Sequence, residues 1–143
     1  MNVIICGVYE VSEYIKEADC AISIVDPGFD FTRPTELYRL DEWLLELEFD
    51  DTWLEVSKFD DIYAREDDIY SVIDFVEKCL QDGKESLLIH CHQGISRSTA
   101  IAVAVYAYLE EPCPYERVLR ERYEARPNPY ILELVAEILE LEL

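Results

Sequence analysis

Short apolar runs alternate with helical repeats along most of the chain. Apolar runs bounded by turn residues are typical of buried strands. They predict strands over Val3–Cys6, Ala21–Val25, Trp53–Phe59 and Ser86–His90. Apolar residues spaced three and four apart predict helices over Glu10–Ala18, Asp67–Leu80, Ser98–Leu109, Pro114–Glu124 and Pro129–Leu141. The acidic segment Phe29–Asp51 lacks a clear period, so we expect an irregular excursion with at most a short helix.

This order of strands and helices predicts an α/β fold. We expect a central, mostly parallel sheet of about four to five strands, flanked by helices, in a single domain over residues 1–143. In such sheets, ligands bind at the carboxyl ends of the strands. Asp60-Asp61 and Cys91 both follow predicted strands, which makes their loops the first places to look for a site.

Charge excludes several kinds of partner. The 143 residues include 32 acidic and 12 basic side chains, a formal net charge of -20. Such a surface repels nucleic acid, anionic lipid and acidic peptides, and we expect neither nucleic acid nor a membrane as a partner. The longest apolar run, Thr99–Leu109, is shorter than the ~20 residues of a membrane span, and no basic leader precedes the first run. We expect a cytoplasmic monomer that does not bind a membrane.

The five cysteines are odd in number and lack paired CxxC spacing, which argues against a disulfide framework or a zinc site. They fit a reducing compartment. The sequence leaves open whether Cys6, Cys20, Cys79 or Cys113 protects Cys91 by a disulfide under oxidation.

The segment from His90 to Thr99 carries the strongest chemical signal. Cys91 and Arg97 have five residues between them, in a loop that joins a buried strand to a helix. Amides pointing inward along that loop, together with the Arg97 guanidinium, would favour a thiolate and would also hold a phosphate. The residues predicted to form this phosphate loop are His92, Gln93, Gly94, Ile95, Ser96 and Arg97.

Neighbouring side chains have predicted roles in the same loop. The planar fork of Arg97 suits two oxygens of a phosphoryl group, and Gly94 allows the torsion angles that turn the amides inward. The Ser98 hydroxyl could stabilise the thiolate as it leaves, and His90 could organise the loop by hydrogen bonds.

Displacement by a thiolate also requires a general acid to protonate the departing oxygen. Asp61 is the preferred candidate because it stands at a predicted strand end beside Ile62. Asp60 is the second candidate, and Asp51, in the similar pair Asp50-Asp51, is the third.

The pattern His90-Cys91-x5-Arg97-Ser98 resembles the signature loop of cysteine-dependent protein tyrosine and dual-specificity phosphatases, in particular their small bacterial and archaeal members. The resemblance implies a two-step hydrolysis of phosphomonoesters. Cys91 would take the phosphoryl group, Asp61 would protonate the leaving oxygen, and Asp61 would then activate water. It implies no metal or cofactor, a phosphorylated protein or a small aryl phosphate as substrate, and loop support from Asn128.

Departures from that family bear on the substrate. The sequence has no Asn-Arg-Tyr-like segment of the kind that builds a deep phosphotyrosine pocket, which favours a shallow, dual-specificity-like pocket. The loop also lacks the lysines of the lipid phosphatases. Two other functions stay open at this point: a rhodanese-like sulfurtransferase, whose cysteine loop is typically shorter, and a catalytically weak phosphobinding module.

Overall fold

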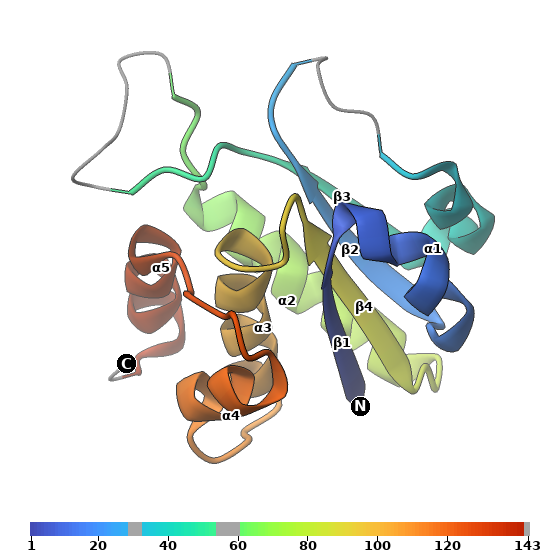
Figure 1. The fold of residues 1–143 in the computed structure, drawn as a ribbon. Helices are drawn as coiled ribbons and strands as arrows, with labels where there is room; N and C mark the ends of the chain where they lie inside the picture. The colour runs from blue at the N-terminus through green and yellow to red at the C-terminus, as the bar shows by residue number, and fades with distance from the viewer. Residues whose placement is uncertain (29–32, 54–60, 142–143) are drawn as a thin grey trace.

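A four-stranded parallel sheet forms the centre of the molecule. The computed structural model describes residues 1–28, 33–53 and 61–141. Its strands are β1 (Asn2–Gly7), β2 (Cys20–Val25), β3 (Leu44–Glu48) and β4 (Ser86–Cys91). They lie in the order β1-β4-β2-β3, and every pair is parallel. This arrangement, drawn in Figure 1, confirms the predicted α/β fold with a mostly parallel sheet.

Helices cover both faces of the sheet. One face packs against a helical segment made of η1 (Val8–Glu10), α1 (Val11–Tyr14) and η2 (Ile15–Glu17), and against the 3₁₀ segment η3 (Thr35–Trp43). The longer helices α2 (Glu66–Gln81), α3 (Arg97–Tyr108), α4 (Pro114–Glu121) and α5 (Pro129–Leu139) gather on the other face (Figure 1). The described part of the chain contains no helix long and apolar enough to cross a membrane.

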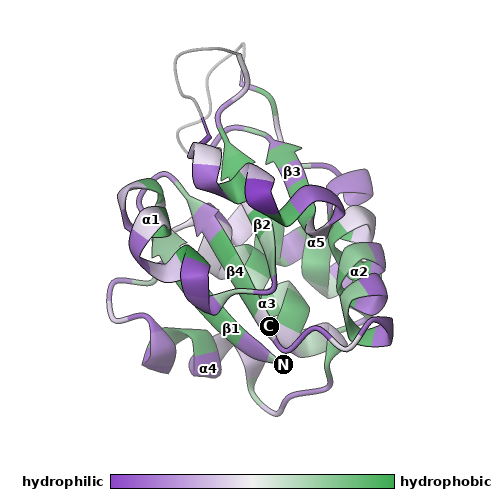
Figure 2. Ribbon diagram, turned by 90° about the vertical axis from the view of Figure 1, so that its right-hand side faces the viewer, coloured by the Kyte–Doolittle hydropathy of each residue, from purple (hydrophilic) through white to green (hydrophobic). Residues whose placement is uncertain are grey.

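Helix α3 is the centre of the larger core. Its residues from Arg97 to Tyr106 are all buried, between strands β4 and β1 on one side and helices α2, α4 and α5 on the others. Small side chains at Ala100, Ala102 and Ala104 let these neighbours approach closely. In Figure 2 the strands and α3 are largely green, whereas α2 and α4 show purple outer faces. A helix that is apolar all round is expected at such a central place.

Most predicted elements are confirmed to within a few residues, but the segment from Phe29 to Asp51 is more regular than the excursion with at most a short helix that the sequence predicts. It contains η3 and the edge strand β3. Leu47 of β3 is buried while Glu46 and Glu48 point outward, so the strand is half-buried and acidic on its outer face. Arg33 forms ion pairs with both glutamates, at 3.2 and 3.8 Å, and pairing with β2 completes the strand. These contacts are made only in the folded chain.

Two other predictions differ in detail. The predicted helix over Glu10–Ala18 is a short α-helix flanked by 3₁₀ turns, which are common at helix ends. Trp53, the first residue of the strand predicted over Trp53–Phe59, lies in irregular structure, and the rest of that segment lies outside the described residues.

All four strands end at the same edge of the sheet because they are parallel. Glu10 follows β1, Asp26 follows β2, Asp51 follows β3, and the loop after Cys91 follows β4. Residues far apart in the sequence therefore meet at this edge.

Replacing the fully buried Ile101 by alanine tests the role of α3 in the core. We expect Ile101→Ala to lower the free energy of unfolding by about 2–5 kcal/mol, because it leaves a cavity under the helix that carries Arg97. Leu80→Ala, at a helical position that is 39% exposed, is the control and should cost about 1 kcal/mol or less. Equal losses in urea unfolding of the two variants would contradict this account of the core.

Candidate functional site

The Cys91 sulfur lies at the floor of a pocket. Cys91 is the last residue of β4 and is 3% exposed. Its Sγ is 3.1 Å from the Ser98 Oγ and accepts a hydrogen bond from the Gly94 backbone N–H at 3.3 Å. The Gly94 amide thus donates to the sulfur, and the Ser98 hydroxyl lies within hydrogen-bond distance of it.

The loop carbonyls bond to groups outside the pocket, and this orients the loop. The Val8 N–H donates to the His92 carbonyl at 2.9 Å, the Arg126 N–H to the Ile95 carbonyl at 2.8 Å, and the Asn128 N–H to the Ser96 carbonyl at 3.1 Å. The Arg122 side chain donates to the carbonyls of Gln93 and Gly94, each at 3.0 Å. Because five successive carbonyls are held outward, the loop amides are turned toward the other side, where the sulfur lies. This is the geometry of an anion-binding nest.

Arg122 is itself fixed by an acid from the opposite end of the chain. Its Nη2 lies 2.9 Å from the Glu10 Oε1, which also accepts a hydrogen bond from the Gly7 N–H. The Glu10 hydrogen bond raises the pKa of Arg122 against the opposing effect of burial. The loop therefore rests on an ion pair between residues that follow β1 and α4.

The loop packs so tightly on this support that Gly94 has no room for a side chain. A Cβ at Gly94 would lie 2.5 Å from the Cys6 carbonyl carbon and 2.7 Å from the Arg122 Nη2. Its φ of +74° also lies in the region that favours glycine. Both observations agree with the role predicted for Gly94.

Arg97 presents one edge of its guanidinium to the pocket. Its Nη1 donates to the Asp26 Oδ1 at 2.7 Å and to the Phe49 carbonyl at 2.9 Å. The buried Nε has no hydrogen-bond partner among the described residues. An unpaired buried donor is costly, and a phosphoryl oxygen in the pocket would supply its acceptor. The bonds at Nη1 hold the guanidinium in place, and no hydrogen bond to a described residue occupies Nε or Nη2, a pair of donors that suits an oxyanion.

His90 lies in a buried chain of hydrogen bonds behind the loop. Its Nδ1 is 3.0 Å from the Cys91 carbonyl, which can only accept, so Nδ1 carries the proton. Its Nε2 therefore accepts from the Ser23 hydroxyl at 2.6 Å, and Ser23 in turn accepts from the Arg33 Nε at 3.0 Å. Burial lowers the pKa of His90 from 6.5 to about 4, which keeps the imidazole neutral at physiological pH. His90 thus fixes the start of the loop.

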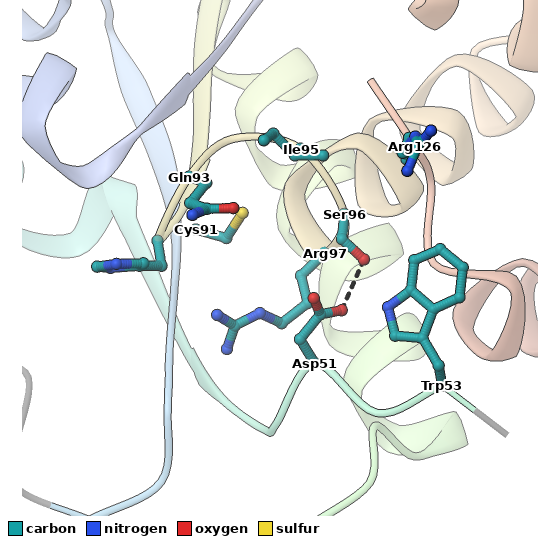
Figure 3. A pocket seen from close by; sticks show the side chains of 9 residues that line it. Asp51, Trp53, Cys91, Gln93, Ile95, Ser96, Arg97 and Arg126 are labelled. Atoms are coloured by element: carbon teal, nitrogen blue, oxygen red, sulfur yellow. Dashed lines mark hydrogen bonds between the residues drawn. The ribbon is translucent and has the colours of Figure 1, made fainter. Parts of the chain in front are cut away.

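Asp51 is the carboxylate that lines the Cys91 pocket. The pocket has a volume of about 200 Å³, and its described lining residues are Asp51, Trp53, Cys91, His92, Gln93, Ile95, Ser96, Arg97 and Arg126. The Asp51 Oδ1 accepts hydrogen bonds from the Ser96 hydroxyl at 2.6 Å and from the Asn128 Nδ2 at 2.9 Å. Both bonds reach Oδ1, and no hydrogen bond joins Oδ2 to another described residue; Figure 3 draws the bond from Ser96.

Asp61, the preferred candidate for the acid, does not line the pocket. It stands next to Ile62, whose backbone N–H donates to the Asp50 carboxylate at 2.7 Å and whose carbonyl accepts from the Asp50 N–H. Asp60 lies outside the described residues. The structure thus brings the third candidate, Asp51, together with Cys91.

Asn128 connects three parts of the site. Its backbone N–H supports the Ser96 carbonyl, and its side-chain Nδ2 donates to Asp51 and to the Thr52 carbonyl. Its Oδ1 accepts from the Ile131 N–H and so caps α5. The predicted support of the loop runs through the backbone of Asn128, while its side chain holds the segment that carries Asp51.

Cys6 and Cys91 lie on neighbouring strands but on opposite faces of the sheet. All five thiols are free in the structure. Cys6 is aligned with His90 in the pairing of β1 with β4, so its side chain shares the face of His90 and not that of Cys91. Burial raises the pKa of the Cys6 thiol to about 12, which keeps it protonated.

Sequence reasoning missed Trp53 and Arg126, which line the pocket, and also Glu10, Asp26, Arg33 and Arg122, which hold the loop and Arg97 in place. Asp26 carried a usable signal, since it directly follows a predicted strand. Glu10 and Arg122 are 112 positions apart, and nothing local to either indicates the pair.

The buried His90 predicts a dependence of stability on pH. The unfolded chain binds its proton more tightly than the folded chain does, so stability should decrease as pH falls from about 6.5 toward about 4. This group contributes a slope of at most about 1.4 kcal/mol per pH unit. Urea unfolding between pH 5 and 6.5 should show a smaller slope for His90→Gln than for the control His92→Gln. An NMR titration of His90 with a midpoint near 6.5 would refute the prediction.

The ion pair of Arg122 with Glu10 predicts a remote effect on anion binding. Removing it with Arg122→Gln frees the carbonyls of Gln93 and Gly94 and loosens the amide cradle. We expect the affinity for vanadate or phosphate, measured by calorimetry, to fall about tenfold. Arg117→Gln, which breaks ion pairs with Glu111 and Glu121 away from the pocket, is the control. If both variants bind vanadate like the original chain, the ion pair does not hold the loop.

Solved structures, but not sequence comparisons, reveal relatives of this fold. No family model and no curated protein matches the sequence. The structure of Tk-PTP in its active form matches with a TM-score of 0.70 and 17% identity, covering 99% of this chain and 94% of that one. PTP-2 phosphatase of Cydia pomonella matches at 0.67 and 18%, covering 96% and 85%. Human DUSP28 matches at 0.62 and 18%, covering 96% and 91%. The chain therefore has the fold of the protein tyrosine and dual-specificity phosphatases.

Proposed function

We propose that this chain is a cysteine-dependent phosphatase that hydrolyses phosphomonoesters through a phosphocysteine on Cys91. The observation that carries the proposal is the convergence of Cys91, Arg97 and Asp51 on one pocket. The Ser98 hydroxyl and the Gly94 N–H lie beside the sulfur, and the Arg97 Nε has no acceptor among the described residues. A pocket with a nucleophile, an anion cradle and a carboxyl group meets the requirements of phosphoryl transfer.

In the first step, the Cys91 thiolate attacks phosphorus from one side while the bond to the leaving oxygen breaks on the other. The loop amides and the Nε and Nη2 of Arg97 bind the three equatorial oxygens. The protonated Asp51 carboxyl donates its proton to the leaving oxygen, and the alcohol or phenol departs. Its place above the loop, held by Ser96 and Asn128, supports this role.

In the second step, water attacks the phosphocysteine. Asp51, now a carboxylate, accepts a proton from the water, and the bond between phosphorus and sulfur breaks. Phosphate leaves and the Cys91 thiolate is restored. The Ser98 hydroxyl at 3.1 Å and the Gly94 N–H at 3.3 Å stabilise the charge that returns to sulfur.

Asp51 replaces Asp61 as the preferred acid in this proposal because it lines the pocket and Asp61 does not. We retain a phosphorylated protein or a small aryl phosphate as substrate. Trp53 and Ile95 supply apolar walls against which the organic part of such a substrate can lie.

Hydrolysis of p-nitrophenyl phosphate in the presence of a chelator tests the proposal. Cys91→Ser should abolish turnover, because a hydroxyl is a poor nucleophile at neutral pH. Asp51→Asn should lower kcat by roughly 10²–10⁴, because the amide cannot donate the proton that the leaving oxygen needs.

Asp61→Asn is the matched control, an identical change ten positions away and outside the lining residues. A large loss with Asp61→Asn and none with Asp51→Asn would restore Asp61 as the acid and leave the phosphatase intact. Undiminished turnover by Cys91→Ser would overturn the mechanism. Sulfur transfer from thiosulfate without phosphatase activity would instead identify the rhodanese-like alternative.

A further inference from the structure

A second guanidinium stands at the pocket that holds Cys91. Arg126 lines this pocket together with Trp53, as Figure 3 shows. Arg97 is buried beneath the loop, whereas the Arg126 side chain is exposed to solvent at the rim. The two cations thus lie at different depths of one pocket.

The backbone of Arg126 is fixed against the loop. Its N–H donates to the Ile95 carbonyl at 2.8 Å, and its neighbours Ala125 and Pro127 are buried. Two residues later, Asn128 is anchored to Ser96. The position of the Arg126 backbone, from which the guanidinium extends, is therefore fixed by the same hydrogen bonds that orient the loop.

Its charge is not neutralised by the acids of the described chain. Arg33, Arg97, Arg117 and Arg122 each form ion pairs with Asp or Glu. Among the residues that the structure describes, the Arg126 side chain has no such partner. The chain has a net charge of -20. An arginine that has no ion pair therefore makes the surface at this pocket locally positive.

We propose that Arg126 and Trp53 form a subsite for a second anionic group next to the phosphoryl group of the substrate. This inference rests on the proposed phosphatase function and narrows its substrate class to phosphorylated polypeptides with a carboxylate or another phosphoryl group beside the phosphorylated residue. The guanidinium pairs with that group, and the half-buried indole of Trp53 limits the water around the pair. The acidic surface beyond the pocket still repels extended polyanions, because its field reaches about 8 Å in physiological salt.

Matched phosphopeptides test the subsite. One pair places Asp or Asn beside phosphotyrosine, and a second pair places phosphothreonine or threonine there. We expect kcat/KM to favour the anionic member of at least one pair by roughly 2- to 10-fold, and the ratio to shrink in 0.5 M salt. The two pairs separate a carboxylate from a phosphoryl group as the preferred neighbour.

Arg126→Gln should bring both ratios to about one. Arg120→Gln is the control, since it removes the same charge from an exposed position on α4 that does not line the pocket. It should keep the preference. Ratios near one in the original chain, or ratios equal in Arg126→Gln and the original chain, would overturn the subsite while leaving the phosphatase intact.

Calorimetric binding of the same peptides to Cys91→Ser measures the preference without turnover. If no phosphate ester is hydrolysed by the original chain, the proposed function fails, and the binding ratios with and without Arg126→Gln still decide whether the subsite exists. The subsite is supported if Cys91→Ser binds the anionic peptides more tightly than the neutral ones and the added Arg126→Gln removes this difference. Equal binding of anionic and neutral peptides by Cys91→Ser refutes it.

Discussion

The outward anchoring of the loop carbonyls is the constraint on which the site depends. A peptide unit has its N–H and C=O on opposite sides, so holding the carbonyls of residues 92–96 outward fixes where the amides point. The donors come from β1, from Arg122 and from the segment before α5. Without these hydrogen bonds the loop would be a flexible turn. Binding an anion would then cost the conformational entropy of ordering the loop backbone.

The acidic side chains near the site differ in the groups that they contact. Asp26 holds the Nη1 of Arg97, Glu10 holds Arg122, and Asp51 is held by Ser96 and Asn128 above the pocket. Aspartate and glutamate side chains thus orient one cation, support the loop through another, and place a carboxyl group at the pocket. In so acidic a chain, the partners and not the number of acids distinguish these roles.

Behind the loop, hydrogen bonds run from Arg33 through Ser23 and His90 to the Cys91 carbonyl, and Arg33 also donates to the Leu47 carbonyl of the edge strand β3. Arg33 also binds Glu46 and Glu48, so it joins β3 to β2. The neutral, buried imidazole fits this network because each of its nitrogens has one defined role. The strand that precedes Asp51 and the strand that ends at Cys91 are thereby joined beneath the site.

The sequence by itself determined the alternation of strands and helices and the loop from His90 to Ser98 that holds Cys91 and Arg97, because these follow from local periodicity and from residues a few positions apart. Only the tertiary structure decided that Leu44–Glu48 is a strand, that Arg122 supports the loop, and that Asp51 and not Asp61 lines the pocket. Each of these depends on contacts between residues from different strands. Parallel strands bring such residues to one edge of the sheet. The local sequence does not indicate which of several similar aspartates lies at that edge.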